Sequence, residues 1–291
     1  MGDHSPPRLL LILLFVIVYA IALAINALAG SGKGPFLHNT GNVSGKYETE
    51  ITPAGWAFSI WGIIYTWLLI MVVYVLTWLC RRTPSGWMYC SPALLPAGFF
   101  LAWICNMVLN MTWLVLWDRE QIISGLIVLA LTAFSNYLLI FFSCRGLSEH
   151  GTWLQQHYPR DLWCIRILVQ NGIAIYTTWT TIATLINLTI VMDLSGVSKT
   201  NAATVSLCFL LIEVLLWFVL ENFVIDRHVR HILTIYPVVI WALAANVYRH
   251  FDPEEPGRNA KFTVVLLVLS CVLFAFRVGL VIWKRRKNPL I

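Results

Sequence analysis

The chain has 291 residues and a formal net charge of +6, and 59% of its residues are hydrophobic whereas only 12% are charged. A soluble domain carries about 25% charged residues, so this composition excludes an ordinary soluble globular protein. In so apolar a chain the positive charge gives no argument for a nucleic-acid partner, and we expect the lipid bilayer as its surroundings.

Long apolar runs predict membrane-spanning helices, because about 20 residues cross the hydrocarbon core. Their continuous apolarity favours helices over the alternating strands of a closed barrel. The runs are Leu9 to Ala29, Pro53 to Leu79, Pro92 to Trp117, Ile122 to Ser143, Leu162 to Val191, Ala203 to Val224, Ile232 to Val247 and Phe262 to Trp283. They predict an all-α, polytopic membrane helix bundle of about eight transmembrane helices. The seventh run is short, and Asp118 to Gln121 predict a tight hairpin turn.

The first run has two interpretations. Arg8, the apolar run and the small residues Ala27-Leu28-Ala29 together resemble a cleavable signal peptide. The run is longer than the ~7–15 apolar residues of a signal segment, which favours a helix that stays in the protein. Cleavage remains the alternative at this point.

The distribution of Lys and Arg predicts the orientation. With eight spans both termini lie on one side, and that side has more Lys and Arg, including Arg81, Arg82 and the tail Lys284 to Lys287. The positive-inside rule then places both termini in the cytoplasm. Asn42-Val43-Ser44, in the first outer loop, is a glycosylation sequon and predicts a glycoprotein of the secretory route or plasma membrane. The mitochondrial outer membrane stays open as the alternative.

The second span begins with an unusual density of aromatic residues, "TPAGWAFSIWGIIY". Trp56 lies where interfacial tryptophans are common. Trp61 and Tyr65 lie deeper, and at helical spacing they share one face with Phe58. This face predicts either packing against other helices or the wall of a cavity.

Two further motifs combine tryptophan with a buried amide. The third span contains "LNMTW", with Asn110 and Trp113, and the fifth contains "YTTWTTIATLIN". The residues of interest in the fifth span are Tyr176, Trp179, Ala183 and Asn187. In the predicted topology all three motifs meet at one depth in the outer half, under the loop from Gly30 to Thr52. The alternatives are a mostly apolar ligand pocket and simple helix packing bridged by amides.

Two charges lie inside predicted spans. Glu213 is in the middle of the sixth span, and Arg277 is about two turns from the cytoplasmic end of the eighth. Intramembrane charges are costly and suggest function. We predict an intramembrane pair, with snorkelling of Arg277 to the interface or a coupling role in transport as alternatives.

The sequence shows no recognisable enzyme or metal motif. His228 and His231 are three residues apart, but no third ligand is evident, so we expect no metal site. It contains no Gly-rich phosphate loop and no credible nucleophile–base pair, so we expect no catalytic residues and no enzyme.

Together, the three aromatic motifs resemble those of the translocator protein family, also called tryptophan-rich sensory proteins (TspO/MBR). The resemblance covers residues 1–192 and predicts a five-helix unit there, followed by a three-helix membrane extension at 193–291. The chain departs from the family in the spacing of Trp56 and Trp61, which is one residue shorter. It also has Ile175 where a proline is expected, and it carries the additional helices.

The resemblance implies that the protein binds a planar apolar molecule, a porphyrin or a sterol, for sensing or transport. The implied ligand-binding residues are Trp56, Phe58, Trp61, Tyr65, Asn110, Trp113, Tyr176, Trp179, Ala183 and Asn187. No cofactor is required, and a porphyrin or haem would be a ligand. The alternatives are a solute transporter or channel that uses Glu213 and Arg277, and a tetrapyrrole-modifying membrane enzyme. A homodimer is one assembly to be tested.

Overall fold

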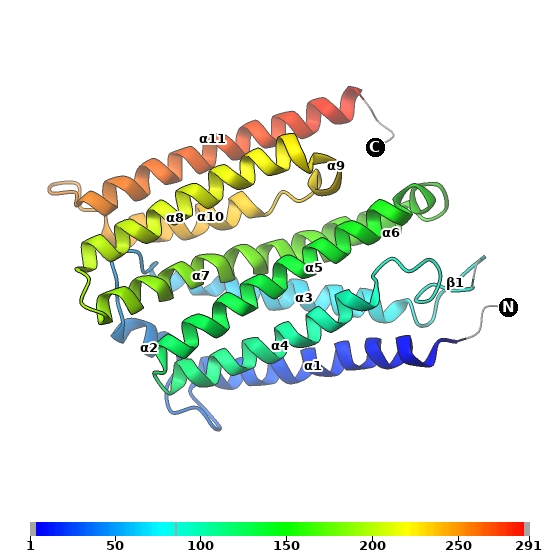
Figure 1. The fold of residues 1–291 in the computed structure, drawn as a ribbon, viewed down its shortest axis with the longest axis horizontal. Coiled ribbons are helices and arrows are strands. Elements are labelled where there is room, and N and C mark those ends of the chain that lie inside the picture. The colour runs from blue at the N-terminus through cyan, green and yellow to red at the C-terminus, as the bar shows by residue number, and fades with distance from the viewer. Residues whose placement is uncertain (1–3, 85, 288–291) are drawn as a thin grey trace.

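The computed structural model describes residues 4–84 and 86–287, which form a bundle of long antiparallel helices (Figure 1). Apolar segments become helices because a helix satisfies its own backbone hydrogen bonds. The long helices are α1 (Pro6–Ser31), α3 (Ile60–Thr77), α4 (Ala97–Asp118), α5 (Ile122–His157), α7 (Gly172–Leu194), α8 (Lys199–Val219), α10 (Ile235–His250) and α11 (Arg258–Lys287). The prediction of an all-α polytopic membrane bundle is confirmed.

Shorter elements join these helices. They are α2 (Thr40–Lys46), a 3₁₀ turn (Gly55–Ser59) before α3, the strands β1 (Arg82–Thr83) and β2 (Gly86–Trp87), α6 (Pro159–Cys164), a π-helical segment (Ile165–Asn171), a second one (Leu220–Val224) and α9 (Asp226–Val229). The two strands form a small antiparallel hairpin between α3 and α4. The predicted turn between α4 and α5 is present, with Glu120 at a positive φ of 55°.

Among the described residues, 7 helices are long and apolar enough to cross a membrane. The exception among the predicted spans is α10, whose 16 residues reach about 24 Å, less than the ~30 Å hydrocarbon core. It nevertheless runs along α7 and α11 through the bundle. As a result, α1 begins and α11 ends at the same end of the molecule (Figure 1).

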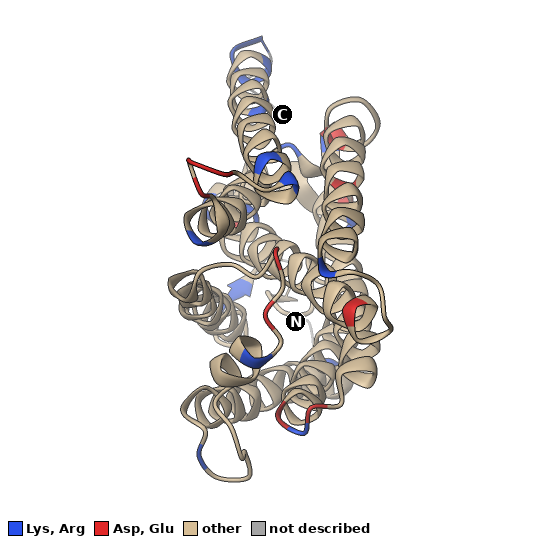
Figure 2. Ribbon diagram, turned by 90° about the vertical axis from the view of Figure 1, so that its left-hand side faces the viewer, with Lys and Arg blue, Asp and Glu red and all other residues tan. Residues whose placement is uncertain are grey.

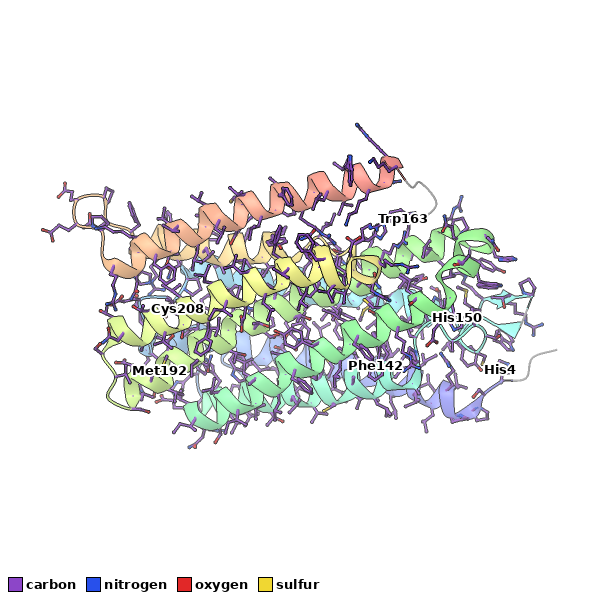
Figure 3. All side chains as sticks on the ribbon, turned by 45° about the horizontal axis from the view of Figure 1, so that its top comes forward. His4, Phe142, His150, Trp163, Met192 and Cys208 are labelled. Atoms are coloured by element: carbon purple, nitrogen blue, oxygen red, sulfur yellow. The ribbon has the colours of Figure 1, made fainter. Side chains whose placement is uncertain are left out.

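Five helices form a closed ring. Each contacts the next in the order α1, α4, α5, α7, α3 and back to α1, and Figure 2 views them end-on from the side of α2. The remaining long helices, α8, α10 and α11, form a second layer in which α8 and α10 pack on α7. α7 is therefore shared by both layers, and side chains of both layers project into the space between them (Figure 3).

The connection from α8 to α10 folds inwards, with Val229 and Ile232 buried. Its backbone groups are satisfied by Asn171, whose Nδ2 donates to the carbonyl of His231 at 2.7 Å and whose Oδ1 accepts from the N–H of Leu233 at 2.9 Å. Irregular backbone inside a membrane protein is tolerated where the protein itself supplies such partners. This inward fold explains why α10 is shorter than its neighbours.

The predicted boundary between residues 192 and 193 falls in the last turn of α7. The two predicted units share α7 as their contact surface. The division of the chain into a five-helix unit at residues 1–192 and a three-helix extension at 193–291 stays a prediction.

Candidate functional site

The structure brings the deeper aromatic residues together inside the ring. Trp61 stacks on Tyr65 with ring centroids 5.6 Å apart, and it meets Tyr176 and Trp179 edge-on at 6.2 and 6.4 Å. Phe58 contacts Trp179 at 6.1 Å. Trp179 is only 2% exposed and Tyr176 is buried, whereas Phe58, Trp61 and Tyr65 are half-buried. These five residues form an aromatic cluster where α3 and the 3₁₀ turn before it meet α7.

An amide network joins this cluster to α1 and α4. The Tyr65 hydroxyl donates to Asn26 Oδ1 at 2.5 Å, and Asn26 Nδ2 donates to Asn110 Oδ1 at 2.8 Å. The Tyr19 hydroxyl donates to the backbone carbonyl of Tyr65. Sequence reasoning missed Asn26, although an amide within the apolar run "AIALAINALAG" is a signal, because buried amides in membrane helices need partners.

One stripe of α7 faces the site. Tyr176, Trp179, Ala183 and Asn187 recur at intervals of three and four residues, which keeps them on one side of a helix. Trp113 packs in a neighbouring cluster with Trp117, at 5.5 Å, and with Ala183 at its edge. The side chains predicted from the fifth span and from α4 therefore lie on adjoining walls.

Three buried polar atoms in this region have no hydrogen-bond partner among the residues that the structure describes. They are the Tyr176 hydroxyl, Asn187 Oδ1 and Trp113 Nε1. The Nδ2 of Asn187 donates a hydrogen bond to the carbonyl of Ala183 in the same helix. The Asn110 amide lies near the Tyr176 hydroxyl without forming a hydrogen bond of good geometry. A buried polar group without a partner costs about 1–3 kcal/mol.

Trp56 lies apart from the cluster. Its ring is 43% exposed and meets Trp241 and Tyr248 of α10 at 5.0 and 6.4 Å. The 3₁₀ turn at Gly55–Ser59 places Trp56 before the start of α3, so it does not follow the α-helical stripe. In this structure Trp56 joins the ring to the second helix layer.

The segment from Lys33 to Pro53 covers the end of the ring, and we call it the cap. Its first half is held by α4, because Asp118 Oδ1 accepts from the N–H groups of Leu37 and His38 at 2.9 and 2.8 Å. Phe36 and Val43 of the cap pack in the cluster that contains Trp113. The cap therefore touches one wall of the site directly.

The second half of the cap is held by the second helix layer. Glu50 accepts from Thr200 Oγ1 at 2.5 Å and from Asn259 Nδ2 at 2.6 Å. Its carbonyl accepts from Asn246 Nδ2, and Arg249 pairs with Glu48 at 2.7 Å. The cap thus bridges the ring and all three helices of the second layer.

An exposed ion pair also holds the first half of the cap. The Lys46 ammonium pairs with Glu120, which also accepts from the Tyr47 hydroxyl. The hydrogen bonds from Lys46 and Tyr47 lower the pKa of Glu120. Asn42 lies in α2, within the cap, and its glycosylation stays a prediction.

The predicted pair of Glu213 and Arg277 needs correction. Arg277 forms ion pairs with Glu221 at 3.3 Å and Asp226 at 3.0 Å, and no ion pair joins it to Glu213 among the residues described. Its Nη1 also donates to Asn222 Oδ1 at 2.9 Å. Eight residues, or about 12 Å of helix, separate Glu213 from Glu221. Arg277 meets the inward-folding connection, which carries acidic groups of its own.

Comparison with known proteins points to the same family as the three aromatic motifs. A family model described as TSPO-like protein matches residues 12–279. No curated protein and no solved structure matches the chain. The matched range continues through α8, α10 and most of α11, beyond the residues 1–192 that the motifs indicate. Since the match covers most of a multi-pass membrane chain, the protein belongs to the TSPO-like family.

Proposed function

We propose that the protein binds a planar apolar molecule with a polar edge, of the porphyrin or sterol class, inside the five-helix ring beneath the cap. The observation that carries this proposal is the set of buried polar atoms without partners, Tyr176 hydroxyl, Asn187 Oδ1 and Trp113 Nε1, beside an aromatic cluster. Ligand sites combine mostly apolar walls with a few such orienting groups.

The chemistry of these atoms suits the proposed ligands. Trp113 Nε1 is a donor, Asn187 Oδ1 is an acceptor, and the Tyr176 hydroxyl is both. A sterol hydroxyl would donate to one of them and accept from another, and the acidic edge of a porphyrin would accept from the donors. The Trp61 and Trp179 rings supply flat apolar surface, which favours a planar molecule.

Binding requires a rearrangement. The rings of Trp61, Tyr65, Tyr176 and Trp179 contact one another, so they must separate to admit a planar molecule. The cap must move as well, because Phe36 packs in the same cluster as Trp113. We therefore propose that sensing or transport begins with opening of the cap and of the aromatic cluster.

The experiment is a titration of the purified protein in nanodiscs with protoporphyrin and with cholesterol, following tryptophan fluorescence. Trp179→Ala should weaken binding by about 1–3 kcal/mol, the scale of a lost aromatic contact in a packed site. Trp153→Ala is the matched control, because Trp153 stacks on His157 at the far end of α5. Equal losses in both variants, or no binding by the wild type, would contradict the proposal.

The alternative functions have less support. A transport path that uses Glu213 and Arg277 would need both charges to line the same route through the membrane. Arg277 instead forms ion pairs with Glu221 and Asp226. A tetrapyrrole-modifying reaction would need an acid, base or nucleophile at the site, and the ionisable groups among the site residues identified above are the phenols of Tyr65 and Tyr176.

A further inference from the structure

A cavity lies on the other side of α7. Its volume is about 840 Å³, and residues of α5, α7, α8, α9 and α10 line it. On α7 it is lined by Thr177, Thr178 and Thr181, which alternate along the helix with Tyr176 and Trp179 of the proposed site. Because successive helical residues point in different directions, α7 separates two sites.

The cavity opens sideways between α5 and α8. Phe141 of α5 and Leu216 of α8 line it and are 56% and 55% exposed. Exposed apolar residues in the middle of membrane-spanning helices face lipid. A molecule dissolved in the membrane therefore reaches this cavity laterally, without passing the cap.

Most polar groups in the walls are already satisfied. The hydroxyls of Thr177 and Thr178 donate to carbonyls of their own helix at 2.7 and 2.8 Å. The Thr181 hydroxyl lies 2.7 Å from the Tyr137 hydroxyl. These hydroxyls therefore need no ligand to satisfy their hydrogen bonds.

Glu213 differs from these groups. It lines the cavity from α8, and no ion pair or hydrogen bond to its carboxyl is present among the described residues. The sequence predicts Arg277 as the partner of Glu213, but Arg277 forms ion pairs with Glu221 and Asp226 instead. At the mouth of the cavity, Arg145 is paired with Glu149 at 2.9 Å. An ionised carboxylate in an apolar wall is costly unless a cation accompanies it.

We propose that this cavity binds a lipophilic amine, whose protonated nitrogen pairs with the Glu213 carboxylate while its apolar body fills the space between α5 and α8. The volume matches that of sites for small organic molecules, about 300–1,000 Å³. The rings of Tyr137, Phe141 and Tyr236 also line the cavity, and aromatic faces favour a cation. A plain lipid chain would fill the volume and leave Glu213 without a partner. This site is independent of the proposed site inside the ring.

The test compares two probes that differ in charge only. One is a tricyclic hydrocarbon with a dimethylamino end, and the other is its carbon isostere with an isopropyl end. Equilibrium dialysis against protein in nanodiscs, with empty nanodiscs subtracted, should show the amine binding about tenfold or more tighter, as a partly desolvated charge pair would give. Glu213→Gln should abolish this preference. Glu149→Gln removes a carboxylate from the mouth of the same cavity and should keep it.

Equal affinity for the two probes in the wild type would overturn the proposal, as would a preference that survives in Glu213→Gln. A measurement on the wild type guards against a misfolded variant. Dicyclohexylcarbodiimide modifies membrane carboxyls, and the amine should slow modification of the Glu213 peptide in mass spectra, whereas the isostere should not. Equal protection by both probes would contradict the site. Porphyrin titration of Glu213→Gln should give the wild-type affinity, which separates this proposal from the first.

Discussion

At the residue scale, Arg277 is the most consequential charge in the fold. It is fully buried. At the inward-folding connection it forms ion pairs with Glu221 and Asp226 and donates a hydrogen bond to Asn222. Removal of Arg277 leaves the buried Glu221 carboxylate without its ion-pair partner, whereas Asp226 keeps Arg230 and Lys284. Breaking a buried pair in this way costs about 3–5 kcal/mol. Arg277→Leu should therefore lower the thermal unfolding midpoint strongly in detergent.

Arg145→Leu is the matched control for this prediction. Arg145 and Glu149 form an exposed pair one turn apart in α5, and such pairs contribute about 0–1 kcal/mol. Its unfolding midpoint should stay close to that of the wild type. Similar shifts in both variants would show that Arg277 is not the organising charge of the connection.

His231 makes the same connection sensitive to pH. Burial, together with the nearby Arg166 and Arg230, lowers its pKa to about 4, and its ring meets Trp163 edge-on. An unfolded histidine titrates near ~6.5, so the unfolded chain binds more protons between about pH 6.5 and 4. Stability should fall as pH is lowered through this window. His231→Gln should show a smaller drop in unfolding midpoint between pH 7 and pH 5, and an undiminished drop would refute this role.

At the element scale, two of the carboxylates that hold the cap act on different parts of it. Glu120 holds its first half through Lys46 and Tyr47, and Glu50 holds its second half through Thr200 and Asn259. Each carboxylate joins the cap to a different helix layer. The two halves should therefore loosen independently.

Hydrogen exchange measures this independence. Glu50→Ala should speed exchange around residues 48–54, because its partners on α8 and α11 are lost, and it should leave residues 40–47 near the wild-type rate. Glu120→Ala should give the reverse pattern. Uniform loosening of the whole cap in both variants would mean that it opens as one piece.

The sequence predicts some elements well and others poorly, for physical reasons. Apolar length indicates the spans, and the face shared by Phe58, Trp61 and Tyr65 does meet Trp179 and Tyr176. Trp56 lies apart from this cluster because a 3₁₀ turn precedes α3. The local sequence pattern does not reveal this turn. The sequence does not predict the ion-pair partners of Arg277, because they lie on the chain segment that folds inwards between α8 and α10. The depth of a residue along a predicted helix, which suggests Glu213 as the partner, does not reveal such a segment.

At the scale of the whole molecule, α1 begins and α11 ends at the same end of the bundle (Figure 1). The excess of Lys and Arg on that side predicts that it is cytoplasmic. Tags fused to the two termini should both be inaccessible in intact cells, and Asn42→Gln should remove a glycan from the protein. A tag accessible at one terminus only would contradict the eight-helix topology.

The central claim concerns the atoms left without partners inside the ring, and Tyr176→Phe tests it most directly. If the Tyr176 hydroxyl exists to meet a ligand, its removal takes away a buried group without a partner and should leave the ligand-free protein as stable or more stable, by up to about 1–3 kcal/mol. The same variant should bind protoporphyrin or cholesterol about 5- to 150-fold more weakly. Measured together, unfolding midpoint and affinity should move in opposite directions. A loss of stability with unchanged affinity would contradict the account and make the Tyr176 hydroxyl a structural group.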